Sequence, residues 1–218
     1  KKYFKKFDKK NKIISNIPIH KKKIESKIFL HKKDLRQSSI IFAGEGISRN
    51  DPFFYSAYVM NYILGGGGFF SKLTTEIREK RGLVYSVYSY LYRYDKYNFF
   101  SGGADTSNEN VDKVIKIIKE ELMKVKKRGV TKKELKNAKN YLINSYVLRL
   151  DSNKKVASIL LNTQMDGFNI DFFEKRNDYI NSVSLEDIKK VASRILDENQ
   201  IFFLVIGNPA DLKNVNKI

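Results

Sequence analysis

Cysteine and histidine, the side chains that most often bind zinc, are scarce in this sequence. The 218 residues include no cysteine, which excludes disulfides, thiol nucleophiles and cysteine-ligated metals. The two histidines, His20 and His31, lie eleven positions apart in a lysine-rich stretch and lack the ligand spacing of a zinc motif. The sequence therefore predicts no metal site built from this chain alone.

Residues 61–90 (NYILGGGGFFSKLTTEIREKRGLVYSVYSY) contain the other candidates for chemistry. A predicted helix ends there on four consecutive glycines, and because one glycine is enough to end a helix, four predict a free hinge. Arg78 and Tyr85 follow, seven positions apart. The residue types alone leave a structural role open for both, Arg78 as a solvated helix residue and Tyr85 as part of the sheet packing.

Hydrophobic periodicity and end signals predict the elements that position this segment. The predicted strands cover 27–31, 37–43, 83–92, 98–104 and 200–206. The predicted helices cover 53–64, 71–81, 153–164, 171–181 and three segments that open with a capping residue and a partner three positions later. These three pairs are Thr106 with Glu109, Thr131 with Glu134 (a helix to about Leu150) and Ser184 with Asp187 (a helix to Leu196).

The order of the elements predicts one α+β domain of two layers, a mainly antiparallel sheet with helices packed on one face. The strands 83–92 and 98–104 form a hairpin with its turn at Asp95 and Lys96, which favours antiparallel pairing. The last strand must return to the same sheet to bury its apolar run. We expect residues 24–218 to form this domain and residues 1–23 to be a linker or the tail of a preceding domain.

The net charge of +18 is typical of proteins that bind nucleic acids. However, residues 1–36 alone contribute +11 of it, with 14 Lys and Arg against 3 Asp and Glu, and no recognition motif accompanies them. A solvated basic face explains the charge better, so nucleic acid is not expected as a partner. A nucleic-acid-binding module is kept as an alternative, which would show steeply salt-dependent affinity.

The same segment, 61–90, resembles a known family. A helix that ends in a glycine run, followed by EIREKRG and LVYSVYSY, is similar to the C-terminal domain of the inverzincin metallopeptidases, which include pitrilysin, insulin-degrading enzyme and mitochondrial processing peptidase. The strand, loop and helix before it and the last strand (IFFLVIGNP) follow the same pattern, so the resemblance covers about 35–211. The chain looks like a bacterial-type, processing-peptidase-like member.

The resemblance implies a division of labour between two domains. In such enzymes an N-terminal domain carries the H-x-x-E-H motif and the zinc, and this sequence has no such motif. It implies that Zn²⁺ is bound by a fused domain or by a separate catalytic subunit. This chain would close the peptide-binding chamber, bind peptide or unfolded protein, and be inactive as an isolated chain.

The resemblance also implies roles for particular residues. The family's C-terminal domain contributes an Arg and a Tyr, seven residues apart, that contact the substrate near the metal, and Arg78 and Tyr85 match them. A guanidinium or a phenol beside the attacked carbonyl oxygen would stabilise the negative charge that develops there. Arg81 is a competing candidate for the cation.

The glycine run has a counterpart in the processing-peptidase relatives, where a glycine-rich loop is implicated in presequence binding. The resemblance therefore makes four residues candidate substrate contacts: Gly65, Gly66, Gly67 and Gly68. The phenylalanines that follow, Phe69 and Phe70, are expected to anchor the core instead.

A structural role is the main alternative to proteolysis. Relatives of this fold that have lost catalysis serve as core proteins of a respiratory complex or persist as inactive pseudo-peptidases, although intact Arg78 and Tyr85 argue against complete loss. No run approaches the roughly 18 apolar residues of a membrane span, and no signal peptide is evident. We expect a soluble protein, with bacterial cytoplasm, periplasm and organelle matrix all open.

Overall fold

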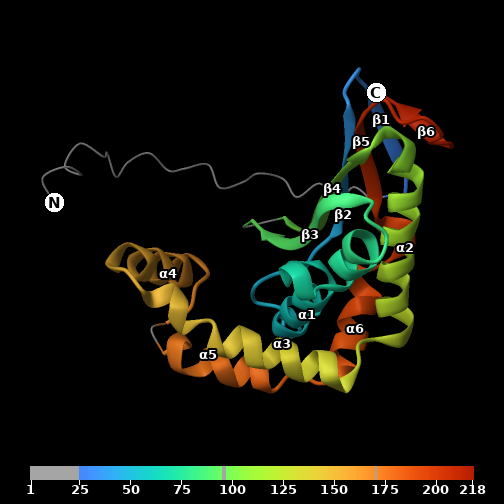
Figure 1. The fold of residues 1–218 in the computed structure, drawn as a ribbon. Helices are drawn as coiled ribbons and strands as arrows, with labels where there is room; N and C mark the ends of the chain where they lie inside the picture. Colours follow the sequence, from blue (N-terminus) through green and yellow to red (C-terminus); the bar gives the residue numbers. More distant parts are fainter. Residues whose placement is uncertain (1–24, 95–96, 170) are drawn as a thin grey trace, which may run out of the picture.

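Figure 1 shows the fold in a computed structural model, which describes residues 25–94, 97–169 and 171–218. The expected linker at 1–23, His20 and the expected turn at Asp95 and Lys96 lie outside the described residues.

Six strands of the described part of the chain form a mixed sheet in the order β3-β4-β2-β5-β1-β6. Neighbours among β3, β4, β2 and β5 are antiparallel, whereas β1 pairs in parallel with both β5 and β6. The prediction of a mainly antiparallel sheet is confirmed, but the parallel end and β6 were not predicted. The strands are β1 (Ile28–Lys32), β2 (Gln37–Glu45), β3 (Val84–Arg93), β4 (Asn98–Ser107), β5 (Phe202–Gly207) and β6 (Val215–Lys217).

The helices pack against one face of this sheet and against each other, which confirms the α+β class (Figure 1). Helix α1 contacts α6 and β3, α2 contacts α6, β2 and β4, and α3 contacts α5. Helix α4 lies on the opposite side of the molecule from α2 in Figure 1. The helices are α1 (Phe54–Asn61), α2 (Val111–Arg128), α3 (Lys132–Asn144), α4 (Asn153–Met165), α5 (Phe172–Asn181) and α6 (Leu185–Ile195).

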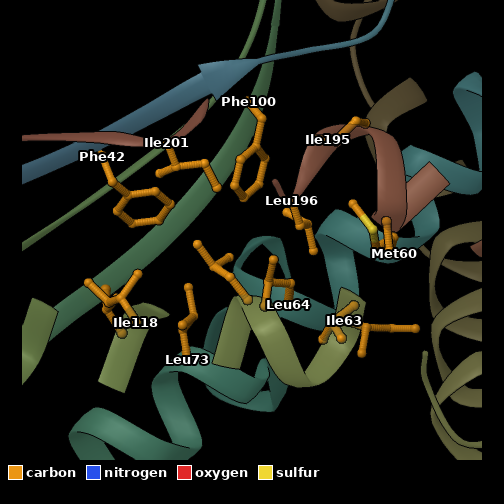
Figure 2. Packing of buried hydrophobic residues seen from close by; sticks show 14 of the residues in the cluster. Phe42, Met60, Ile63, Leu64, Leu73, Phe100, Ile118, Ile195, Leu196 and Ile201 are labelled. Carbon is orange, nitrogen blue, oxygen red and sulfur yellow. The ribbon is translucent and has the colours of Figure 1, made fainter. Parts of the chain in front are cut away.

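The core lies between the sheet and the helices, and alternation along the strands explains why only one face is covered. On β2, Ile40 and Phe42 are buried, while Ile41 between them is 41% exposed. Figure 2 shows Phe42 and Phe100 of the sheet beside Leu64 and Ile118 from the helical layer. Burial of each such side chain contributes about 1.5–3 kcal/mol, so this layer contact stabilises the fold.

Two of the three predicted capping boxes are confirmed. Thr131 with Glu134 opens α3, and Ser184 with Asp187 opens α6, each with both reciprocal hydrogen bonds. The prediction at Thr106 is wrong, because Thr106 belongs to β4 and its buried hydroxyl donates to the carbonyl of Leu83 (2.6 Å). With that hydroxyl bonded across the sheet, α2 begins only at residue 111.

The expected helix from Thr131 to about Leu150 is shorter in the structure. Helix α3 ends at Asn144, and a separate 3₁₀ turn covers Val147–Leu150. Val147 and Leu148 are 65% and 71% exposed, so the apolar residues on which the longer helix was predicted do not face the core. Because residues 147–150 bury no apolar face, tertiary packing does not stabilise a continuation of α3 through them.

Candidate substrate-contact site

A glycine turn joins Arg78 to Tyr85. Arg78 lies in the π-helical turn Thr74–Glu79, and Gly82 adopts the left-handed conformation that favours glycine (φ 60°). The amide of Gly82 donates to the carbonyl of Arg78 (2.8 Å), which closes the end of the helical turn. Strand β3 begins two residues later, so both side chains emerge at the same end of β3.

The guanidinium of Arg78 contacts two aromatic rings. Its central carbon is 4.6 Å from the ring centre of Phe69 and 5.3 Å from that of Tyr85. Tyr85 is 84% exposed. Within the described part of the chain, Arg78 has no ion pair and donates no hydrogen bond, so its five N–H donors are available to a ligand.

Arg81 has a different environment. It donates to Glu76 (Nη1 to Oε2, 2.7 Å), and Lys80 donates to the other oxygen of the same carboxylate (2.5 Å). The hydrogen bond from Lys80, followed by that from Arg81, lowers the pKa of Glu76 to about 2. The charge of Arg81 is therefore compensated locally, whereas Arg78 has no carboxylate partner among the residues that the structure describes.

The first glycine of the run is a packing residue. Gly65 is buried against β3, where a Cβ atom would lie 2.4 Å from the Ser89 hydroxyl oxygen. The same serine forms two buried hydrogen bonds with Asn61, its hydroxyl donating to Oδ1 (2.8 Å) and its carbonyl accepting from Nδ2 (3.2 Å). The expected free hinge is therefore wrong for this residue, because the absent side chain allows the helix end to lie on the strand.

The later glycines are more accessible. Gly66 and Gly68 are exposed and Gly67 is half-buried. Gly68 has φ 58° and begins the 3₁₀ turn Gly68–Phe70, a conformation that favours glycine. Gly66, Gly67 and Gly68 can thus be reached by a peptide, whereas Gly65 cannot; contact with substrate stays a prediction.

Phe69 and Phe70 are not core anchors, contrary to the sequence-based expectation. They are 61% and 85% exposed. The chain is extended at residue 71 (ψ 151°), so both phenylalanines precede the helical turn that carries the buried Leu73 and Ile77. Sequence reasoning thus missed Phe69 as a neighbour of Arg78. The available signal was Gly68, because a glycine directly before the two phenylalanines allows the left-handed turn that separates them from the preceding helix.

The described residues do not fit a zinc site. Among residues 25–94, 97–169 and 171–218, no three His, Cys, Asp or Glu side chains lie close enough together to hold a metal ion. His31 lies on β1, where Nδ1 is 3.2 Å from the carbonyl oxygen of Ile218. None of the helices in the described part of the chain is both long and apolar enough to cross a membrane.

Comparisons with known proteins agree on one family. The family model described as "Peptidase M16 inactive domain" matches residues 1–142. The chain is 29% identical over 174 residues to the "Uncharacterized zinc protease YmxG" of Bacillus subtilis, which covers 79% of this chain and 42% of that protein. It is also 29% identical over 150 residues to the "Non-peptidase homolog YmxG" of Helicobacter pylori, covering 69% of this chain and 34% of that protein.

A solved structure supports the same relationship. The crystal structure of a peptidase M16 inactive domain from Pseudomonas fluorescens superposes with a TM-score of 0.79 at 27% sequence identity, covering 87% of this chain and 45% of that chain. The chain therefore spans less than half the length of each of these relatives.

Proposed function

The chain belongs to the peptidase M16 family, as its inactive domain, and on this premise we propose that it is the substrate-binding half of a zinc metalloendopeptidase. The resemblance to the C-terminal domain of pitrilysin-type peptidases is confirmed by the family match. In the proposed role the chain closes a peptide-binding chamber together with a zinc-bearing domain, which is either fused to it or on a separate subunit.

The observation that carries this proposal is the environment of Arg78. Its guanidinium contacts the rings of Phe69 and Tyr85, and its hydrogen-bond donors are not used by other described residues. Restricting the side chain in this way lowers the entropy lost when it binds a ligand. A peptide carbonyl that gains negative charge during hydrolysis would be stabilised by such a fixed cation, with the Tyr85 hydroxyl as a second donor.

The position of β3 supports binding of an extended peptide. β3 is an edge strand of the sheet, and Tyr85 lies near its start, where the pairing with β4 is irregular between Val84 and Val87. Edge-strand N–H and C=O groups without a partner can pair with an added peptide strand. On β3 the carbonyls of Val87 and Ser89 already accept from Thr74 Oγ1 (3.5 Å) and Asn61 Nδ2 (3.2 Å), so the peptide would pair with the remaining groups of the strand. Such a peptide would pass Arg78 and Tyr85.

The proposal is tested by zinc content and cleavage of a fluorogenic peptide, measured on this chain alone and on the chain assembled with its zinc-bearing domain. We expect the isolated chain to be zinc-free and inert and the assembled protein to bind zinc and cleave. Zinc-dependent cleavage by the isolated chain would show that the division of labour is wrong.

The second candidate function is that of a structural pseudo-peptidase. The observation in its favour is that one relative, from Helicobacter pylori, is named a non-peptidase homolog. If the assembled protein neither binds zinc nor cleaves peptides, this alternative replaces the proteolytic one.

A further inference from the structure

A second concave site lies between α1, β3, α4 and α5. It is a cavity of about 300 Å³, at the lower end of the range for small-molecule sites. Four guanidinium groups and a single carboxylate are among the described residues that line it: Arg49, Arg93, Arg149, Arg176 and Asp166. We call this site the arginine pocket.

The single carboxylate of the arginine pocket is shared by two of the arginines. Oδ2 of Asp166 accepts a hydrogen bond from Arg93 (2.6 Å) and lies 3.4 Å from Nε of Arg49. Arg49 is further held by a hydrogen bond from Nη2 to the hydroxyl of Tyr55 (2.9 Å). The charges of Arg49 and Arg93 are therefore balanced within the pocket by Asp166.

The other two arginines lack a negative partner within the described part of the chain. Arg176 is only 6% exposed, yet it donates to neutral acceptors, the carbonyl of Leu142 (3.2 Å) and Oδ1 of Asn177 (3.1 Å), and lies 3.8 Å from the ring centre of Tyr146. Arg149 forms no ion pair with any described residue. A buried charge without a counter-ion is unfavourable, so Arg176 favours the binding of an anion.

The positive charges of Arg176 and Arg149 both affect the pKa of Tyr146, which also lines the pocket. Burial raises the pKa of Tyr146, while the positive charges of Arg176 and Arg149 both oppose the rise. The charges of both arginines therefore act on the same part of the pocket.

We propose that the arginine pocket binds a carboxylate of the peptide substrate, either an Asp or Glu side chain or the C-terminal carboxylate. Guanidinium groups bind carboxylates through paired hydrogen bonds. The aromatic wall, with Tyr55, Tyr58 and Phe172, suits an organic group better than a small inorganic ion. That the ligand is a peptide rests on the proposed function.

The geometry also predicts where the carboxylate lies along the substrate. Tyr90, which lines the arginine pocket, and Tyr85 are five positions apart on β3. Because three steps on β3 match two on β4 between Val84 and Val87, this separation corresponds to about four regular strand steps, or about 13 Å at roughly 3.3 Å per residue. The recognised carboxylate would therefore be about four residues from the bond held at Arg78.

The test measures binding of three peptides, each labelled with the same fluorescent dye that contains no carboxylate, to this chain by anisotropy at physiological salt. One peptide has an internal Glu and an amidated end, the second has Gln and a free carboxylate, and the third has Gln and an amidated end. We expect at least one carboxylate-bearing peptide to bind about tenfold more tightly than the third. Which of the two binds more tightly shows whether the pocket recognises an acidic side chain or the C-terminal carboxylate.

The matched variants are Arg149→Gln in the pocket and Arg128→Gln at the end of α2, both at exposed positions and with the same change of charge. We expect only Arg149→Gln to abolish the preference for a carboxylate. Equal binding of all three peptides, no binding of any, or equal loss in both variants would overturn the proposal.

Failure of this proposal can be separated from failure of the proposed function. In the assembled enzyme, cleavage that depends on Arg78 but shows no preference for acidic peptides would overturn the arginine pocket alone. Carboxylate-selective binding without any cleavage would support the pocket and overturn the proteolytic role.

Discussion

The guanidinium carbon of Arg78 lies 5.3 Å from the centre of the Tyr85 ring, although the two residues belong to different elements. The left-handed turn at Gly82 brings them together, and Phe69 covers the guanidinium at 4.6 Å. The arrangement is thus built within one short stretch of chain. Its contribution to function can be measured one side chain at a time.

Arg78→Ala should lower the turnover of the assembled, zinc-bearing enzyme by tens-fold or more, because it removes a cation that stabilises developing charge. Steady-state peptide cleavage measures the loss, and metal analysis should show unchanged zinc content. Arg81→Ala is the matched control, since Glu76 already compensates that charge. An equal loss in the two variants would contradict the assignment to Arg78.

Tyr85→Phe should lower turnover by a similar factor if the hydroxyl donates to the substrate. Because the side chain is 84% exposed, the free energy of unfolding should change by less than about 0.5 kcal/mol in a denaturant titration. Tyr92→Phe removes a hydroxyl from the far end of the same strand and serves as the control. Wild-type rates for Tyr85→Phe would exclude a role for its phenol.

Phe69→Ala should reduce activity about two- to fivefold, because a cation–π contact at an exposed site contributes roughly 0.5–1 kcal/mol. The measurement is the ratio kcat/KM of the assembled enzyme. Phe70→Ala removes a more exposed ring that has no cation–π contact with Arg78 among the described residues. The explanation fails if the two variants lose activity equally.

Gly65→Ala should destabilise the domain by about 1–3 kcal/mol, because the added methyl group would overlap the Ser89 hydroxyl and disturb its bonds with Asn61. Urea unfolding of this chain measures the change. Gly68→Ala adds the same methyl group where no atom lies within 4 Å, so only the left-handed φ opposes it and the loss should be smaller. A larger loss at Gly68 would refute the packing role of Gly65.

Glu76 makes stability depend on pH in the acid range. Its pKa in the folded protein is about 2, below the ordinary 4.5, because Lys80 and then Arg81 donate hydrogen bonds to it. A carboxylate whose pKa is lower in the folded than in the unfolded protein stabilises the fold at pH values above its unfolded pKa. This stabilisation is lost as the carboxylate becomes protonated at lower pH. The free energy of unfolding should therefore fall as pH decreases from about 4.5 to about 2.

Substitution shows how much of this acid sensitivity comes from Glu76. Glu76→Gln should flatten the decrease in unfolding free energy between those two pH values. Glu79→Gln, which removes a nearby carboxylate that forms no ion pair within the described residues, should leave the decrease unchanged. An unchanged profile in Glu76→Gln would contradict the expected linkage.

Much of the fold was predictable because its signals are local. The capping boxes at Thr131 and Ser184 place two helix starts within one residue, and alternation predicts β2 and β3. The Gly82 turn also has a local signal, a glycine after the last helical residues. For the same reason, the sequence alone predicts that Arg78 and Tyr85 lie on neighbouring elements.

The remaining features depend on contacts between distant residues. Strand β6 is three residues long, with a polar sequence (VNK), and only its pairing with β1 makes it a strand. The hydroxyl of Thr106 bonds across the sheet to Leu83, which no local pattern could distinguish from a cap. The arginine pocket likewise joins residues from 49 to 176, and each of its arginines alone has the pattern of a solvated surface residue.

The position of β1 between β5 and β6 has a consequence for how the chain folds. Ile28 is paired with Phe203, 175 positions later, and with Val215 on the other side. Contacts so distant along the chain form slowly, because a long loop must close before they contribute. During synthesis on the ribosome, β1 would remain unpaired with β5 and β6 while the helices form. Of the six described strands, β1 is synthesised before the others, yet it can be ordered in the sheet only after β5 and β6 have emerged.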